Sequence, residues 1–205
     1  MVAIRGWLIV AALATGCAAP RPNLLLIVVD TLRADHVGAY DGAVATPAID
    51  SLAAAGTMWE RAYTPCPRTT QAVASLMTGL YPQTHGVRVL WGTLTEDQIT
   101  LAEVLGREGF NCGAVVTNHI LDRRSGLAQG FHHYDVAGPS RTAAQTTSAA
   151  IAWIDSAGAR RRPFMLWVHY FDPHMPYAPP REDLMDSVGQ PTVDPEFVTG
   201  FGGLD

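Results

Sequence analysis

The chain has no lysine, because all 14 of its basic residues are arginines. Any mechanism that needs a lysine side chain within this polypeptide is therefore excluded. The 19 acidic residues outnumber the basic ones and give a formal charge of -5. A nucleic-acid partner is not expected, since proteins that bind nucleic acids through the phosphates carry an excess of positive charge.

Cysteine is also scarce, with three residues in the chain: Cys17, Cys66 and Cys112. If the chain is exported, Cys66 and Cys112 could form a disulfide, since disulfides persist outside the cytoplasm. Two cysteines do not establish a bridge, and isolated buried thiols are the default expectation. With 205 residues, 48% of them hydrophobic, the chain can form one globular domain or part of a larger one.

The first 20 residues, MVAIRGWLIVAALATGCAAP, are typical of a targeting segment. The apolar run WLIVAALA is too short to span a bilayer but suits a secretory signal. LATGC resembles the lipobox of bacterial lipoproteins, in which Cys17 would be acylated. A signal peptide cleaved near Ala19 is the alternative. We expect residues 1–19 to direct export to the bacterial cell envelope, on its periplasmic side, with the membrane as a partner through the lipid anchor.

Apolar segments that predict strands alternate with segments that predict helices. The strands are expected at 23–30, 112–118 and 164–171, and the helices at 46–56, 69–79, 101–109 and 141–157. The first strand, NLLLIVVD, is so continuously aliphatic that we expect it to be buried on both faces. The alternation predicts an α/β fold with a parallel sheet, in which ligands bind beyond the carboxyl ends of the strands.

Several polar residues follow these predicted strands and helix starts. Asp30 ends a buried strand, where it would either bind a cation or accept hydrogen bonds from the following turn. Thr69 and Thr70 begin a predicted helix, whose N-terminus favours an anion, although threonine there is more often only a cap. His174 lies in a proline-flanked loop suited to substrate contact, whereas His169 falls within a strand and is expected to be structural.

Four segments, in order, resemble the sulfatase family of the alkaline phosphatase superfamily. They are RPNLLLIVVDTLRADHVGAYD, TPAIDSLAAAGTMWERAYT, ASLMTGLYPQTHGV and FMLWVHYFDPHMPY. The resemblance implies an alkaline phosphatase-like sandwich, with residues 21–180 forming its N-terminal portion and 181–205 leading to a missing C-terminal part. It also implies metal-dependent hydrolysis of a sulfuric, phosphoric or phosphonic ester, either of a small molecule or of a glycan.

The resemblance carries individual roles over to matching positions. Asp30 would bind a divalent cation, for which the family favours Ca²⁺, with Mn²⁺ or Zn²⁺ as alternatives. Thr31 stands where many members have a second aspartate, so it would be a weaker, neutral ligand. His174 matches the histidine of a P-H-x-P motif and would contact the substrate. Asn118 and His119 lie near the place where many members have a lysine and a histidine that stabilise charge, so they would bind the substrate.

The nucleophile position follows from a landmark of the family. Sulfatases carry C-x-P-x-R with the cysteine nine residues before the threonine of LLTG, and nine residues before Thr78 of LMTG is Thr69. Cys66 is three positions too early, and the segment TTQAV lacks the proline and arginine of the maturation signal, which argues against formylglycine. Thr69 would then be both nucleophile and metal ligand, as in threonine-bearing relatives, with Arg68 beside it to hold an anion.

Two hypotheses remain open from the sequence. The first is the N-terminal part of an exported sulfatase-family hydrolase. The second is a catalytically inactive remnant that acts as a binding or structural protein of the envelope. The family's later D-H-G or D-N-G segment, which supplies further metal ligands, is absent from this chain. The chain alone would therefore hold a cation weakly.

Overall fold

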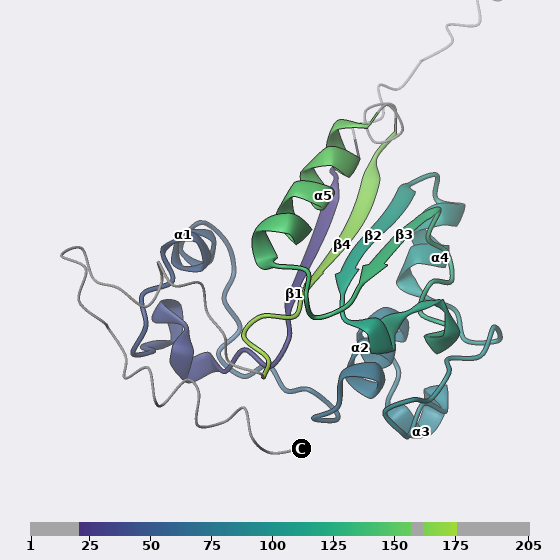
Figure 1. Cartoon of the computed structure of the whole chain (residues 1–205), viewed down its shortest axis with the longest axis horizontal. Helices are drawn as coiled ribbons and strands as arrows, with labels where there is room; N and C mark the ends of the chain where they lie inside the picture. The colour runs from purple at the N-terminus through teal and green to yellow at the C-terminus, as the bar shows by residue number, and fades with distance from the viewer. Residues whose placement is uncertain (1–20, 157–161, 176–205) are drawn as a thin grey trace, which may run out of the picture.

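A computed structural model of the chain describes residues 21–156 and 162–175 (Figure 1). The expected export signal at 1–19, with Cys17, and the expected tail at 181–205 lie outside the described residues. Within the described part, no helix is both long and apolar enough to cross a membrane.

Four parallel strands form one sheet, with the order β1-β4-β2-β3. The strands are β1 (Leu24–Val29), β2 (Asn111–Thr117), β3 (His133–Ala137) and β4 (Phe164–Tyr170). This confirms the predicted parallel α/β fold and three of its strands, while β3 was not predicted. Because the strands are parallel, their carboxyl ends share one edge of the sheet, where Val29 pairs with Tyr170.

Helices cover the two faces of the sheet (Figure 1). The α-helices of the described residues are α1 (Pro47–Ala55), α2 (Thr69–Thr78), α3 (Pro82–His85), α4 (Leu101–Arg107) and α5 (Ala143–Asp155). Two short 3-10 helices, η1 (Ala34–His36) and η2 (Gly38–Tyr40), lie between β1 and α1, and two more, η3 (His119–Leu121) and η4 (Arg123–Ser125), lie between β2 and β3. α5 packs on one face and α2 with α4 on the other, whereas α1 lies to the side of the sheet and packs against η2.

Alternate residues of the central strands point to opposite faces, as strand geometry requires. In β4, Trp167 joins the core beneath α2 and α4, while Leu166 and Val168 join the core beneath α5. Gly113 in β2 lies directly under Trp153 of α5, and a Cβ atom at Gly113 would be 2.4 Å from the indole ring. A side chain at this position would therefore prevent α5 from packing closely on the sheet.

The expectation that the first strand is buried on both faces is wrong. β1 is an edge strand, and α5 covers β2 and β4 rather than β1. Leu26 and Val28 pack against the core beneath α2, but Leu25 and Ile27 are 53% and 49% exposed. β1 is therefore apolar on both faces, but the described residues cover only the face that carries Leu26 and Val28.

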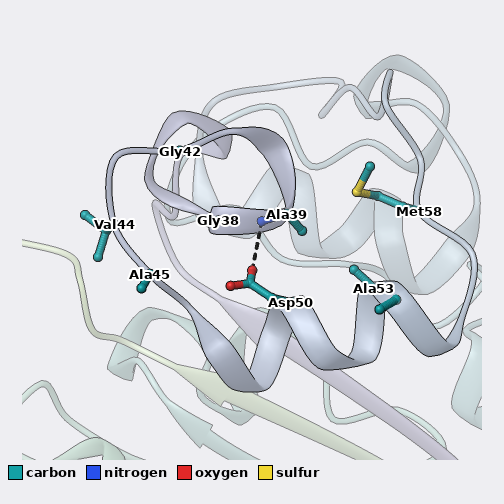
Figure 2. A pocket seen from close by; sticks show the side chains of 9 residues that line it. Gly38, Ala39, Gly42, Val44, Ala45, Asp50, Ala53 and Met58 are labelled. Atoms are coloured by element: carbon teal, nitrogen blue, oxygen red, sulfur yellow. Dashed lines mark hydrogen bonds between the residues drawn. The ribbon is translucent and has the colours of Figure 1, made fainter.

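Asp50 of α1 ties that helix to the loop after β1 (Figure 2). Its carboxylate accepts hydrogen bonds from the backbone N–H of Ala39 at 2.8 Å and from the Thr46 hydroxyl at 2.7 Å. Thr46 is the N-cap residue of α1, yet its hydroxyl makes no cap hydrogen bond. The adjoining cavity of about 650 Å³ is lined mainly by small and apolar residues. Its one carboxylate, that of Asp50, is already bonded to Ala39 and Thr46.

The contact between Gly113 and Trp153 gives the first testable prediction. Gly113→Ala should lower the free energy of unfolding by about 1–3 kcal/mol, because the added methyl group overlaps the indole ring. Gly106→Ala is the matched control in α4, where a Cβ atom meets nothing within 4 Å. It should be neutral or stabilising by up to about 1 kcal/mol, since alanine favours helix. Urea unfolding measures both, and equal effects would contradict the packing described here.

Candidate active site

A cavity of about 850 Å³ opens at the carboxyl edge of the sheet. Its walls come from the loop after β1, the start of α2, the ends of β2 and β4, and the segment that contains Trp91. All the residues expected to act on substrate or metal line it, namely Asp30, Thr31, Arg68, Thr69, Asn118, His119 and His174. The fold thus brings together residues that lie far apart in the sequence.

Asp30 is the buried acid of this cavity. The residue is 8% exposed, and its backbone N–H donates to Tyr170 O at 3.0 Å, which continues the pairing of β1 with β4. Its Oδ2 atom lies 3.0 Å from Asn118 Nδ2, 3.4 Å from the Thr69 hydroxyl and 3.4 Å from His169 Nε2. Three elements of the fold therefore meet at one carboxylate oxygen.

Opposing effects act on the pKa of Asp30. Burial raises the pKa, because it disfavours the charged form. The hydrogen bond and charge of His169, the Asn118 amide and the charge of His174 lower it, and together they outweigh burial. The pKa therefore lies below its ordinary value of 3.8, and the carboxylate is ionised at neutral pH.

Thr69 is the first residue of α2, and its hydroxyl donates to Asp30. Arg68 occupies the N-cap position without a side-chain cap hydrogen bond, and its exposed side chain lines the cavity. The hydroxyl of Thr69 is thus engaged with the acid rather than with helix capping. Cys66 lines the same cavity as a free, half-buried thiol, and Cys112 is a free, buried thiol. The two cysteines are therefore not paired, which is the default expectation from the sequence.

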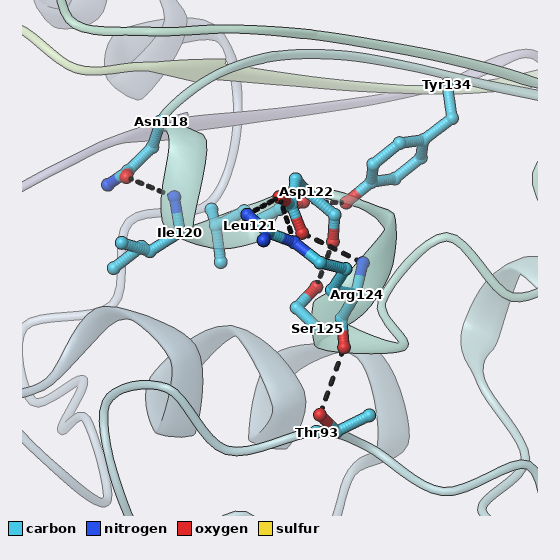
Figure 3. A network of polar contacts seen from close by, with 8 residues as sticks. All are labelled: Thr93, Asn118, Ile120, Leu121, Asp122, Arg124, Ser125 and Tyr134. Atoms are coloured by element: carbon cyan, nitrogen blue, oxygen red, sulfur yellow. Dashed lines mark hydrogen bonds and ion pairs between the residues drawn. The ribbon is translucent and has the colours of Figure 1, made fainter.

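Asn118 joins the acid to the loop that follows β2, and Figure 3 shows its contact with Ile120 in that loop. Its Nδ2 donates to Asp30, while its Oδ1 accepts from the N–H of Ile120 at 3.2 Å and caps η3. The residue is 2% exposed, so the amide is fixed by its contacts at both ends. His119 is exposed, and its ring lies 5.8 Å from that of Trp91 at the cavity wall.

His174 is held by the segment that follows β4. Its ring stacks on Phe171, with the ring centroids 4.5 Å apart. A carbonyl oxygen only accepts, so Nδ1 donates its hydrogen to Met175 O at 2.8 Å. Nε2 is then the ring nitrogen that remains for a ligand in the cavity.

His169 belongs to the site, although the sequence indicated a structural role within its strand. It is 1% exposed, and Nε2 donates to Asp30 while Nδ1 has no partner among the described atoms. The strand register explains the placement, because Val28 of β1 pairs with His169 in β4. The signal that could have revealed it is a histidine at the carboxyl end of a strand, in a position where apolar residues are usual.

Thr31 differs from the other lining residues in its backbone. Its φ of 56° lies in the left-handed region, which a β-branched residue rarely adopts. The side chain is exposed at the cavity. The turn after β1 is therefore strained where it leaves the sheet, a feature common at ligand sites.

The oxygen atoms of the site fit part of the ligand set of a hard cation. Asp30 offers a carboxylate and Thr69 a hydroxyl, and Ca²⁺ takes six to eight such oxygen ligands. Among the described residues no group of three or more His, Cys, Asp and Glu side chains is arranged to hold a metal. A cation held here would complete its ligand set with further oxygen atoms, for which backbone carbonyls and waters are also suitable.

Comparisons with known proteins identify the family of the chain. A profile of the family described as Sulfatase matches residues 22–196, which is most of the chain. The chain belongs to the sulfatase family. Arylsulfatase A of Bos taurus is 38% identical over 135 residues, which are 62% of this chain and 27% of that protein. The arylsulfatase of Clostridium perfringens strain 13 is 31% identical over 116 residues, covering 55% of this chain and 24% of the relative.

Solved structures show the same fold as this sulfatase-family chain. Ps i-CgsB in complex with k-i-k-neocarrahexaose superposes with a TM-score of 0.70 at 23% identity, covering 87% of this chain and 50% of that one. The phosphonate monoester hydrolase of Agrobacterium radiobacter gives 0.66 at 23% identity, covering 78% and 42%. The expected alkaline phosphatase-like fold is thereby confirmed, and the chain spans half or less of these two structures and about a quarter of the two arylsulfatases.

The contact between Asn118 and Asp30 gives the second prediction. Asn118→Asp retains an oxygen for the Ile120 N–H but places a second carboxylate beside Asp30. Repulsion between the two should lower the free energy of unfolding by about 2 kcal/mol at pH 7. The deficit relative to wild type should shrink as the pH falls toward 4, because one proton then joins the pair.

Asn111→Asp is the control, at the opposite end of β2. It should change stability little at either pH. Urea unfolding at pH 7 and pH 4 measures the effects. A pH-independent deficit in Asn118→Asp, or an equal deficit in both variants, would show that Asn118 and Asp30 are not in contact.

Proposed function

We propose that the protein hydrolyses sulfuric esters, or phosphoric or phosphonic esters, with Thr69 as the nucleophile. The observation that carries this proposal is the contact of Thr69 with the buried, ionised carboxylate of Asp30 at the start of a helix. Family membership supports the reaction class. An isolated threonine at a helix start would not support it, since most such residues only cap helices.

In the proposed reaction the Thr69 oxygen attacks the sulfur or phosphorus atom. The hydroxyl proton is lost to solvent, the bond from the central atom to the alcohol oxygen breaks, and the alcohol leaves with a proton. Water then hydrolyses the threonine ester and restores the hydroxyl. Asp30 is a weak base because its pKa is lowered, so its role is to orient the hydroxyl and not to remove the proton.

The anionic part of the ester is proposed to lie at the N-terminus of α2. Backbone N–H groups of the first helical turn have no partner within the helix and favour an anion. Arg68 at the N-cap adds a positive charge, and His174, which also lines the cavity, would donate from Nε2 to the anion when both of its ring nitrogens carry a proton. These groups, with Asn118 and His119, stand in for the lysine that the chain lacks.

Asp30 and Thr69, with Thr31 as a weaker neighbour, are the residues proposed to contact a divalent cation. Such a cation would lower the pKa of the nucleophilic hydroxyl and neutralise negative charge on the ester. The oxygen character of these ligands favours Ca²⁺ over Zn²⁺, which prefers nitrogen and sulfur ligands, while Mn²⁺ remains compatible. A threonine nucleophile makes formylglycine unnecessary in this proposal.

Thr69→Ala tests the proposal directly. Purified protein would be assayed with Ca²⁺, Mn²⁺ or Zn²⁺ against an aryl sulfate, a phosphate diester and a phosphonate monoester. We expect Thr69→Ala to reduce turnover by at least about 1,000-fold, because the nucleophile is lost. Thr69→Ser is the matched control and should retain activity. Equal turnover in wild type and Thr69→Ala would reject Thr69 as nucleophile.

A binding or structural role without catalysis is the second candidate. The lack of lysine in the chain and the altered segment TTQAV at the nucleophile position favour it. Saturable binding of esters by wild type, with no turnover under any of the three cations, would support this role over hydrolysis.

We further propose that the protein is exported and anchored through a lipid on Cys17. The segment LATGC supports the proposal. Mass spectrometry of the membrane fraction should detect a diacylglyceryl cysteine at the N-terminus, and Cys17→Ser should release the protein from that fraction. A wild-type protein found only in soluble form, beginning near Pro20, would exclude the anchor.

A further inference from the structure

Trp91 is an exposed aromatic residue at the wall of the catalytic cavity. Its side chain is 66% exposed, although tryptophan is usually more buried than this. Its only described ring partner is His119, at 5.8 Å between centroids. Most of the indole surface is therefore free to contact a ligand that enters the cavity.

The backbone on both sides of Trp91 is fixed. Leu90 O accepts a hydrogen bond from the buried Thr70 hydroxyl, directly next to Thr69 in α2. The N–H of Gly92 donates to Val89 O at 2.9 Å and closes a turn around Leu90 and Trp91.

On the other side of the turn, the Thr93 hydroxyl donates to Arg124 O at 3.0 Å (Figure 3). Trp91 is thus tied through its neighbours both to the helix that carries the proposed nucleophile and to η4. A rigid aromatic residue contributes more to binding than a mobile one, because less entropy is lost on contact.

We propose that Trp91 determines substrate specificity by stacking on a six-membered ring in the alcohol part of the ester. The inference rests on the proposed function, since the cavity would hold the ester group at Thr69. The flat indole surface matches an aryl ring or the C–H face of a pyranose and gains little from a flexible chain. The substrates are therefore ring-bearing esters, either aryl or glycosyl.

The position of the indole supports this assignment over a structural role. A core tryptophan would be buried, as Trp167 is at 0% exposure. Trp59 is similarly exposed, at 72%, but does not line the catalytic cavity. Exposure and place at the cavity wall together single out Trp91 among the described tryptophans.

The test is a binding measurement, so it does not depend on turnover. All variants carry Thr69→Ala to remove hydrolysis, and saturation-transfer NMR with titration follows phenyl sulfate, glucose 6-sulfate and n-butyl sulfate. We expect at least one ring ester to bind about fivefold or more tightly than n-butyl sulfate. Trp91→Ala should abolish this preference, Trp91→Phe should restore part of it, and Trp59→Ala, the matched control, should leave it unchanged.

Each outcome bears on the inference. Loss of phenyl sulfate binding alone in Trp91→Ala would assign aryl esters, and loss of glucose 6-sulfate binding alone would assign glycosyl esters. No preference for either ring ester in the Thr69→Ala parent, or a preference unchanged in Trp91→Ala, would overturn the role of Trp91. Failure of the proposed function would appear separately in the turnover assay. No turnover by the wild-type protein would reject hydrolysis, and equal turnover in wild type and the Thr69→Ala single variant would reject Thr69 as nucleophile.

Discussion

The site depends on one buried carboxylate. Asp30 ends the edge strand of the sheet with 8% of its surface exposed, where an ionised acid is costly unless strong donors meet it. An amide from the end of β2, a ring from β4 and a hydroxyl from α2 all reach its Oδ2 atom. Hydrogen bonds to this one charge therefore bring together three elements that lie far apart in the sequence.

The same contacts also fix the loop that follows β2. Asn118 cannot turn away from Asp30 without losing the cap of η3, and η4 follows directly, where Asp122 is bonded to the backbone N–H of Arg124. That loop also meets Thr93, next to the turn that carries Trp91. The polar contacts of Figure 3 run from Asn118, which is bonded to Asp30, to Thr93, two residues after Trp91.

The edge position of β1 leaves part of this strand uncovered in the described part of the chain. Its outer edge and the exposed side chains of Leu25 and Ile27 are not covered by the described residues. Nevertheless its carboxyl end is held firmly, because six residues pair in register with β4. The acid can therefore be well positioned although one face of its strand is open.

Local sequence was sufficient to predict the parallel α/β class, most of the helices and strands, and the seven residues expected to line the site. Runs of apolar residues, proline at a helix start and family motifs are readable one segment at a time. β3 escaped prediction, because HYDVA is only 5 residues long, is interrupted by polar His133 and Asp135, and becomes a strand by pairing with β2. The contribution of His169, the exposure of β1 and the place of Trp91 depend on register and strand order. Register and strand order are decided by packing between segments that lie far apart in the chain, so no short stretch of sequence determines them.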